Sequence, residues 1–471
     1  MTMRSSFSGN KIWACALLLT AMSACKKFTE IGPPRDFLSS EEAFATDVSA
    51  NATIANIYNT LTNGALVNQD ATLSLALSAD ELTAVNPSQS QLQLEQNNLT
   101  IDNDNTAALW NAAYQVISQA NVAIQGVTGA TGITPEKKKQ FIGEARFLRA
   151  FSYTYLVNLY GALPLVLDAN WQDHQRIART PADKVYQQII LDLKSAQDSL
   201  PDSYSSGTYI RATRWAATAL LARIYLYDQQ WAAAEAQATD VLENAGIYTG
   251  SLPAPEDVFL AGSEEAIWQL QPASYLSNPI ESNLIAAYGA VNYALTDNLA
   301  NAFEQGDLRK DAWVTETVSD DGSSILYPAK YKGDPYDQSS SEYYMMLRVG
   351  EQLLIRAEAR TMLGNTAAAI ADVNVIRQRA GLDDLPATLD KAGCLAAIAQ
   401  ERRIELLAEW GQRWLDLKRW PALSGATNAV RADEVLSLIK GANWQSTDVL
   451  YPVPAADLKL NPSLYPNNPG Y

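Results

Sequence analysis

Histidine and cysteine are scarce in this sequence of 471 residues. His174 is the only histidine, and Cys15, Cys25 and Cys394 are the only cysteines. A metal site or a catalytic dyad built from several histidines is therefore hard to assemble, although one histidine could still serve in a Ser-His-Asp triad. We predict neither a metal centre nor a cofactor.

Positive charge is also in short supply. The chain has 35 lysines and arginines against 52 aspartates and glutamates, which gives a net charge of −17. Nucleic-acid binding needs a basic surface, so this balance speaks against it. No basic cluster points to an anionic lipid surface, and no apolar run beyond residue 24 is long enough to span a bilayer.

The first 24 residues have the pattern of a signal peptide. Arg4 and Lys11 precede the apolar stretch 12–22, and small residues lead up to Cys25. A cysteine directly after such a site is typical of bacterial lipoproteins, in which it is acylated and becomes the new N-terminus. We therefore predict lipidation of Cys25 and an extended tether over residues 25–38. The alternative is an ordinary cleaved signal with an incidental cysteine.

Processing at Cys25 would leave Cys394 as the single free cysteine of the mature chain. Cys15 departs with the signal peptide and Cys25 carries lipid, so no intramolecular disulfide can form. The protein must then be held together by packing alone, which its size permits. Cys394 lies in helical sequence, and we expect it to be a buried small hydrophobe.

Helical patterns dominate after the tether, and we expect a mainly α fold. In residues 135–160, Thr134 and Pro135 supply a start signal, apolar residues recur at helical spacings, and Gly161 ends the pattern. By such patterns, helices are predicted at 43–61, 105–126, 135–160, 181–200, 211–227, 231–244, 343–363, 366–379 and 392–420. The polar stretch 84–104 between the first two is expected to be a long surface excursion.

Two helix pairs resemble each other. Residues 220–223 (LLAR) and 353–356 (LLIR) each close a helix that turns into an alanine-rich partner. Small residues let antiparallel helices approach closely, and the length of the hairpin is that of a tetratricopeptide repeat. We predict a tetratricopeptide-like helical-repeat scaffold over approximately 39–245 and 343–420, followed by a C-terminal tail over 421–471.

Residues 246–342 break this pattern. Prolines interrupt the stretch, which contains only short strand patterns such as 266–270. Its aromatic residues are Trp268, Tyr275, Tyr288, Tyr293, Trp313, Tyr327, Tyr331 and Tyr336. An irregular, loop-rich insertion that carries aromatic rings between two repeat pairs is where we expect a binding surface.

Several sequence blocks follow one another in a set order along the mature chain. They are 143–150 (GEARFLRA) with 160–165 (YGALPL), 348–359 (RVGEQLLIRAEA), 374–381 (NVIRQRAG), 401–406 (ERRIEL), 411–420 (GQRWLDLKRW), and 451–454 (YPVP) with 467–471 (NNPGY). By these blocks the chain resembles the SusD/RagB family of Bacteroidetes outer-membrane lipoproteins. One departure is at 466–468, where the family usually has a glutamine before Asn-Pro-Gly-Tyr.

The resemblance implies a single SusD-like domain over 39–471 and a non-catalytic role in nutrient uptake. Such a protein is a lipid-anchored, surface glycan-binding lipoprotein of the outer membrane that faces the cell exterior. It captures oligosaccharides and delivers them to a SusC-like TonB-dependent transporter, its partner. In the family the helices serve as scaffold and transporter contact, whereas aromatic and polar residues of the irregular portion hold the sugar.

Sugar C–H faces pack on aromatic rings, and sugar hydroxyls need planar polar partners. We therefore predict glycan binding by residues of the insertion, with Trp171 as a further candidate in a loop outside it. The predicted residues are Tyr275, Tyr288, Asn292, Tyr293, Trp313 and Trp171. The segment 288–293 is favoured because it combines two aromatic rings, a glycine and an amide in six residues.

The charge-rich segment 401–420 invites a catalytic interpretation. Glu409 and Arg413 stand four residues apart, and Glu401, Glu405 and Glu409 share one helical stripe. Ion pairing along a helix explains this pattern without any catalytic role, and we expect these residues to be structural. Glu144, Arg146 and Arg149 are likewise expected to lock neighbouring helices together.

Two other functions remain open from the sequence. A glycoside hydrolase would need two carboxylates roughly 5 to 9.5 Å apart across a sugar site, and 52 acidic residues do not exclude it. A tetratricopeptide scaffold that binds only protein is the second alternative.

Overall fold

The computed structural model describes residues 40–68, 70–204, 208–287, 290–319, 322–337, 339 and 341–471. The predicted signal peptide, Cys25 and the tether lie outside the described residues. None of the helices in the described part of the chain has both the length and the apolar character of a membrane span.

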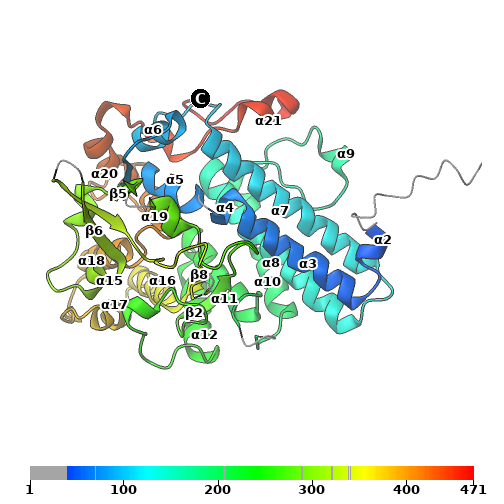
Figure 1. Cartoon of the computed structure of the whole chain (residues 1–471), viewed down its shortest axis with the longest axis horizontal. Coiled ribbons are helices and arrows are strands. Elements are labelled where there is room, and N and C mark those ends of the chain that lie inside the picture. The colour runs from blue at the N-terminus through cyan, green and yellow to red at the C-terminus, as the bar shows by residue number, and fades with distance from the viewer. Residues whose placement is uncertain are drawn as a thin grey trace, which may run out of the picture.

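The long helices pack side by side, nearly in chain order (Figure 1). They are α3 (Asp47–Asn63), α7 (Asp104–Gly129), α8 (Pro135–Tyr160), α10 (Ala182–Ser199), α11 (Arg214–Tyr227), α12 (Trp231–Asn244), α16 (Val349–Met362), α17 (Thr366–Arg379) and α18 (Lys391–Glu405). Each of α7 to α17 contacts the next in this list, as successive hairpins of a helical repeat do. The mainly α prediction is confirmed, and α8, α12 and α17 have the predicted bounds.

The helical array is continuous in space although the insertion interrupts it in sequence. Helix α12 packs directly against α16, which begins more than 100 residues later. The chain leaves and rejoins the array through two strands, β2 (Ala266–Leu270) and β8 (Tyr344–Arg348), which pair antiparallel and are buried throughout. The insertion is thus anchored on the array at both of its ends.

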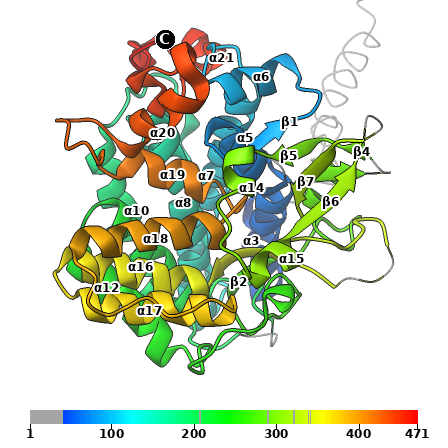
Figure 2. The ribbon, with the colours of Figure 1, turned by 90° about the vertical axis from the view of Figure 1, so that its left-hand side faces the viewer.

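Short hairpins and helices make up the rest of the insertion. They are α13 (Glu281–Ile285), β3 (Ala286–Ala287), β4 (Ala290–Val291), β5 (Tyr293–Leu295), α14 (Asp297–Ala300), α15 (Leu308–Trp313), β6 (Val314–Val318) and β7 (Ser324–Pro328). Strand β3 pairs with β4 and β6 with β7, while β5 pairs with β1 (Leu82–Ala84) from the N-terminal part of the chain. In Figure 2 these strands lie together on the side of the molecule away from α10 and α20 (Arg431–Lys440).

Two expectations about local structure are wrong, and a third segment holds a helix that the sequence pattern did not predict. Residues 344–348 form strand β8 rather than the start of a helix, because pairing with β2 supplies their backbone partners. The predicted helix 392–420 breaks after Glu405 and resumes as α19 (Gln412–Arg419); Ala408, Trp410 and Gly411 adopt positive φ angles in between. The polar stretch 84–104 contains α6 (Gln89–Gln96), which Ser88 and Gln91 start with a capping box.

The C-terminal segment is part of the core. Besides α20 it contains α21 (Ala455–Leu460), and Tyr451 between them is fully buried. The backbone amide of Tyr451 donates to the Leu159 carbonyl at 2.7 Å, and its hydroxyl shares a 2.6 Å hydrogen bond with Ser78. The remaining short α-helices are α2 (Ser40–Ala43), α4 (Ala65–Asn68), α5 (Asp70–Ser78) and α9 (Trp171–His174).

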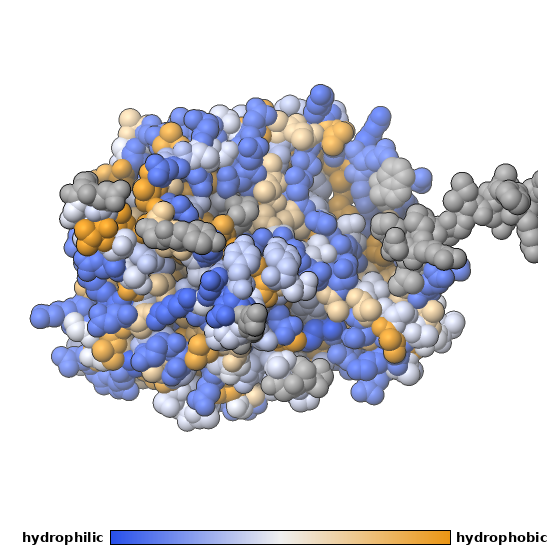
Figure 3. Space-filling view, in the orientation of Figure 1, coloured by the Kyte–Doolittle hydropathy of each residue, from blue (hydrophilic) through white to orange (hydrophobic). Residues whose placement is uncertain are grey.

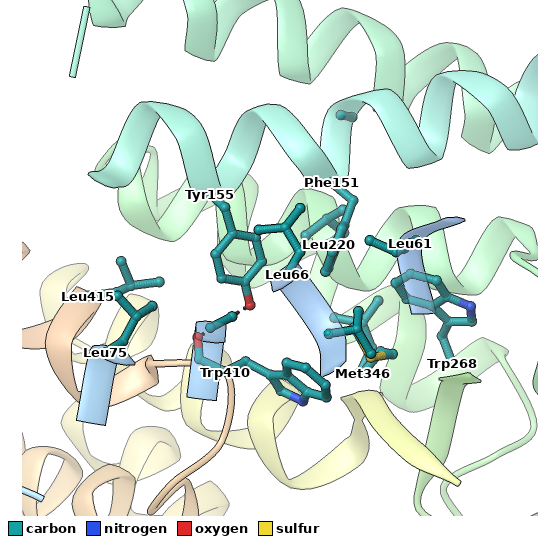
Figure 4. Packing of buried hydrophobic residues seen from close by; sticks show 14 of the residues in the cluster. Leu61, Leu66, Leu75, Phe151, Tyr155, Leu220, Trp268, Met346, Trp410 and Leu415 are labelled. Atoms are coloured by element: carbon teal, nitrogen blue, oxygen red, sulfur yellow. Dashed lines mark hydrogen bonds between the residues drawn. The ribbon is translucent and has the colours of Figure 1, made fainter. Parts of the chain in front are cut away.

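Aromatic residues of the insertion and of the array share one core (Figure 4). Trp268 of β2 is fully buried and meets Phe147 and Phe151 of α8 edge to face, at ring-centroid distances of 4.8 and 5.3 Å. The Tyr155 hydroxyl donates to the carbonyl of Trp410 at 3.3 Å. Cys394 is buried as predicted. The tryptophans at 110, 215, 410, 414 and 420 are buried too, and Trp231 is partly buried.

The charge-rich motif forms a buried ion network and not a helical stripe. The Arg348 guanidinium contacts Glu405 at 2.6 Å, Glu409 at 2.8 Å and Glu265 at 2.9 Å. The predicted pair between Glu409 and Arg413 does not form, because the chain turns between them. Arg413 instead binds Asp80 at 2.7 Å.

The predicted locks on α8 are confirmed. Arg149 pairs with Asp192 of α10 at 2.7 Å, and Arg211 pairs with Glu144 at 2.5 Å. Arg146 donates to Ser195, also on α10. All three are buried or partly buried contacts that fix the position of α8 in the array.

Candidate functional site

The predicted site residues differ sharply in exposure. Tyr275 lies in the loop after β2 with 67% of its surface exposed, as a ring that stacks on a sugar must. Asn292 is exposed too, and its side-chain amide donates to the Leu284 carbonyl at 3.0 Å. Tyr288 lies outside the described residues. Trp171 begins α9, in the connection between α8 and α10, far along the chain from the insertion.

The expectation of an exposed ring is wrong for Tyr293 and Trp313. Tyr293 is 9% exposed and lies on β5, where Gln91 of α6 donates to its hydroxyl. Trp313 is 1% exposed; its indole N–H donates to the Pro255 carbonyl at 2.7 Å, and the Lys330 ammonium lies 4.5 Å from a ring centroid. These rings are already enclosed by protein.

A hollow of about 360 Å³ opens in the insertion, within the size range of ligand pockets. Helix α13, strand β3, Thr315 of β6, the end of β7 and residues 329 and 331–335 of the loop that follows line it. Tyr327 is half-buried, so that part of its ring is accessible. Ser282, Asn283, Thr315, Lys332 and Asp334 supply hydroxyl, amide and charged groups around that ring.

Two loops meet beside this hollow and are latched together by Asn278. Its side-chain amide donates to the carbonyls of Asp334 and Ser339 at 2.9 and 3.1 Å. Its side-chain oxygen accepts from the backbone amides of Ser341 and Glu342 at 3.0 and 3.1 Å. The loop with Tyr275 is thereby held against the loop with Tyr336, whose ring is 59% exposed.

Burial perturbs the ionisable groups behind the hollow. Burial raises the pKa of Glu281 to about 8, with the opposing effect of Lys330 too weak to reverse it. Burial also lowers the pKa of Lys330 to about 8, against the pull of Glu409. Glu342 accepts hydrogen bonds from the amides of Lys332 and Gly333, at distances down to 2.8 Å, and so fixes the loop backbone.

The hollow is suited to binding a polar ligand with an apolar face. Among its described lining residues Asp334 is the only acid, whereas glycoside hydrolysis requires a pair of carboxylates. The described residues also contain no group of three or more histidines, cysteines or acids placed to hold a metal ion. Figure 3 shows polar and apolar residues interspersed over the face drawn.

The sequence matches two related family models. Residues 36–226 match a family described as starch-binding associating with the outer membrane, and residues 281–471 match the SusD family. The chain belongs to the SusD/RagB family. Two curated relatives from Formosa agariphila agree: SusD-like protein P2 is 28% identical over 98% of this chain and 99% of its own, and P25 is 24% identical over 95% and 96%.

Solved SusD-like structures share the fold of this SusD/RagB protein. A SusD superfamily protein from Bacteroides vulgatus has a TM-score of 0.77 at 20% identity, covering 90% of this chain and 99% of its own. A laminarin-binding SusD-like protein has a TM-score of 0.72 at 21% identity, covering 91% and 100%. At these identities the likeness establishes the fold.

Sequence reasoning did not select Tyr327 or Tyr336 as site residues. Tyr336 follows Gly333, Asp334 and Pro335, which are turn-forming residues, and an aromatic ring in such a turn has little chance of being covered. That signal was available in the sequence. Nothing in the sequence around Tyr327 indicates that its ring is accessible. The strand pattern does not say which face of the strand the neighbouring loop covers.

Proposed function

We propose that this SusD/RagB protein binds a glycan on the surface formed by Tyr275, Tyr327 and Tyr336 and the adjoining hollow, which we call the tyrosine surface. The observation that carries the proposal is the pair of exposed rings on two loops that Asn278 latches together. Rings held by a rigid frame offer stacking area at little entropic cost. The amide and hydroxyl groups of the hollow then supply partners for sugar hydroxyls.

Two other predicted residues, Tyr288 and Asn292, are close in the sequence to Ala287, which lines the hollow. They remain proposed contacts. The family description names starch binding, and one protein of the same fold binds laminarin. These facts support a carbohydrate as the ligand class. Capture without cleavage is part of the proposal, since Asp334 is the only acid among the described lining residues.

Binding experiments separate this proposal from the two alternatives. The purified mature protein is run on affinity gels that contain neutral polysaccharides, including laminarin and starch, and released reducing ends are measured in parallel. Retardation without new reducing ends is expected. Release of sugar would favour a hydrolase, and no retardation by any polysaccharide of a broad panel would favour a protein-binding scaffold.

Exposed tyrosines of the surface should contribute directly to affinity. We predict that Tyr275→Ala or Tyr336→Ala weakens glycan binding by roughly 1 to 3 kcal/mol, by analogy with other stacking contacts. The thermal midpoint should stay nearly unchanged because neither ring is packed. Tyr465→Ala is the control, since Tyr465 is 60% exposed outside the insertion. Calorimetric titration with equal affinities in all variants would remove the two tyrosines from the site.

Delivery to a SusC-like transporter and anchoring through a lipid on Cys25 complete the proposal. The family description supports an association with the outer membrane. Cys25→Ala should abolish labelling by a fatty-acid analogue and release the protein from the outer membrane. Membrane retention of an unlabelled variant would show that a partner suffices, and protease treatment of intact cells would separately test exposure at the cell surface.

A further inference from the structure

A second hollow, of about 480 Å³, lies outside the tyrosine surface. It is bounded by α18, α14, α19 and α20, which Figure 2 shows next to one another. Three arginines line it, Arg403, Arg413 and Arg431, together with the acids Asp80 and Glu434. We call it the arginine hollow. Its excess of positive charge stands out in a chain whose net charge is −17.

The arginines are incompletely neutralised. The two carboxylate oxygens of Asp80 serve two guanidiniums: Arg413 binds both at 2.7 and 2.9 Å, and Arg403 binds one at 3.0 Å. The guanidinium of Arg431 makes no hydrogen bond to any described residue. Its nearest acid is Glu434, at 3.6 Å from Nε.

The carboxylate of Glu434 already accepts hydrogen bonds from other groups. It accepts them from the backbone amides of Leu423 and Ser424, both at 2.7 Å, and so holds the loop before α20. These bonds lower the pKa of Glu434 and keep it ionised, but they compete for the oxygens that Arg431 would use. The guanidinium of Arg431, which lines the hollow, therefore keeps unused hydrogen-bond donors.

Two buried Nε–H groups without partners add positive charge that nearby acids do not fully offset, although these atoms are themselves closed off from the hollow. The Nε atoms of Arg403 and Arg431 are inaccessible to solvent and have no hydrogen-bond partner among the described residues. Burial lowers the pKa of both arginines; Asp80 raises that of Arg403 and Glu434 raises that of Arg431, and the neighbouring Arg413 charge opposes both acids. Glu81, behind Asp80, has its pKa raised to about 7 by burial and offers only part of a charge near neutrality. An added anion would relieve this imbalance.

The rim of the hollow is apolar. Leu423 and Leu438 are 77% and 87% exposed, and Ile439 next to them is 43% exposed. A free inorganic anion would leave this rim unused, whereas the C–H face of a sugar would cover part of it. The combination of a cationic base and an apolar rim matches a sugar unit that carries an acidic group.

We propose that the arginine hollow is an anion-binding subsite that takes the carboxylate or sulfate group of an acidic sugar. Arg431 is the main contact, with Arg403 beside it, while Arg413 and Asp80 fix the frame. The preference for an anion is inferred from the residues of this hollow alone. The inference that the anion is part of a sugar rests on the proposed function.

The test compares acidic and neutral ligands of equal length. Binding of a uronic-acid oligosaccharide, a sulfated oligosaccharide and the matching neutral oligosaccharide is measured by calorimetry, with sodium sulfate alone as a further probe. The variants are Arg431→Gln and, as a control with the same loss of charge, Arg214→Gln. Arg214 is a partly exposed arginine of α11 whose nearest acids are 3.4 and 3.6 Å away.

At least one acidic oligosaccharide should bind about tenfold more tightly than the neutral one, and Arg431→Gln should abolish this advantage while Arg214→Gln keeps it. Raising the salt concentration should weaken only the acidic ligands. Arg431-dependent binding of sulfate without any oligosaccharide binding would support the anion site and contradict the proposed function. Equal affinities for acidic and neutral ligands, or an advantage that survives in Arg431→Gln, would overturn the subsite.

Discussion

Tyrosines in and next to the insertion differ in exposure and therefore in role. Tyr275 and Tyr336 present their rings to solvent, whereas Tyr293, Tyr331 and Tyr344 are buried and hydrogen-bonded. The Met345 amide donates to the Tyr331 hydroxyl at 2.8 Å, and the Ile280 amide donates to the Tyr344 hydroxyl at 3.1 Å. Tyr331 lines the hollow and packs against Tyr344, and substituting these buried rings would test stability rather than binding.

Glu281 leads to a prediction about how the stability of the protein depends on pH. Its pKa is raised mainly by burial, from 4.5 to about 8, so the folded protein holds this proton while the unfolded chain has already released it. Stability should therefore fall as the pH rises from about 4.5 to 8, at up to about 1.4 kcal/mol per pH unit from this group. In Glu281→Gln this part of the pH dependence should disappear.

Urea unfolding at pH 5, 6.5 and 8 measures the effect as the difference between the wild-type protein and Glu281→Gln. That difference removes the contributions of other groups, including Glu81, whose pKa is raised to about 7. Parallel stability curves for the two proteins would show that Glu281 is ionised in the folded state.

At the scale of elements, asparagine side chains hold loops where regular secondary structure is short. Asn278 joins the loops on either side of the tyrosine surface, and Asn374 of α17 does the same for the loop after it. The Asn374 amide donates to the Leu385 carbonyl at 3.0 Å, and its side-chain oxygen accepts from the Leu385 amide at 2.9 Å. Asn278 and Asn374 are thus similar latches, and the one at Asn278 borders the proposed site.

Removing the latch should loosen the site. Asn278→Ala leaves several buried backbone groups without partners, which costs roughly 1 to 3 kcal/mol each where water cannot reach them. Amide hydrogen exchange in residues 333–342 should accelerate, and glycan affinity should fall. Asn374→Ala is the matched control: it should accelerate exchange near Leu385 and leave affinity unchanged. Unaltered exchange in residues 333–342 would mean that the loops hold each other without Asn278.

For the whole molecule, the buried ion network joins the insertion to the helical array. Arg348 stands where β8 becomes α16, and its partners come from the strand entry at Glu265 and from the end of α18. Arg309 of α15 adds contacts to Glu401 at 2.9 Å and Glu405 at 3.1 Å. Segments far apart in the chain are therefore fixed to one another by charge as well as by packing.

Breaking this network should be costly. Arg348→Met leaves carboxylates buried without their shared counter-charge, and we expect a loss of roughly 3 to 5 kcal/mol in the free energy of unfolding. Arg214→Met, which breaks partly exposed pairs, should cost less than about 1 kcal/mol. Guanidinium chloride denaturation compares the two. A small loss for Arg348→Met would mean that the remaining arginines neutralise the carboxylates by themselves.

The sequence by itself determined the mainly α class, the position of most long helices and the family. Helix α8 illustrates why: its start signal, apolar period and terminal Gly161 are all local to the segment. Likewise, the burial of Cys394 followed from its helical neighbours.

Only the tertiary structure decided which rings face solvent and which charges pair. Strand β8 depends on β2, which lies more than 70 residues earlier, and Arg413 pairs with Asp80, over 300 residues away. No local pattern encodes such partners. Tyr293 and Tyr275 look alike in sequence, yet Tyr293 is buried beside α6 and Tyr275 is 67% exposed. Burial is a property of the neighbours that folding brings together, and so the candidate site emerged only from the assembled chain.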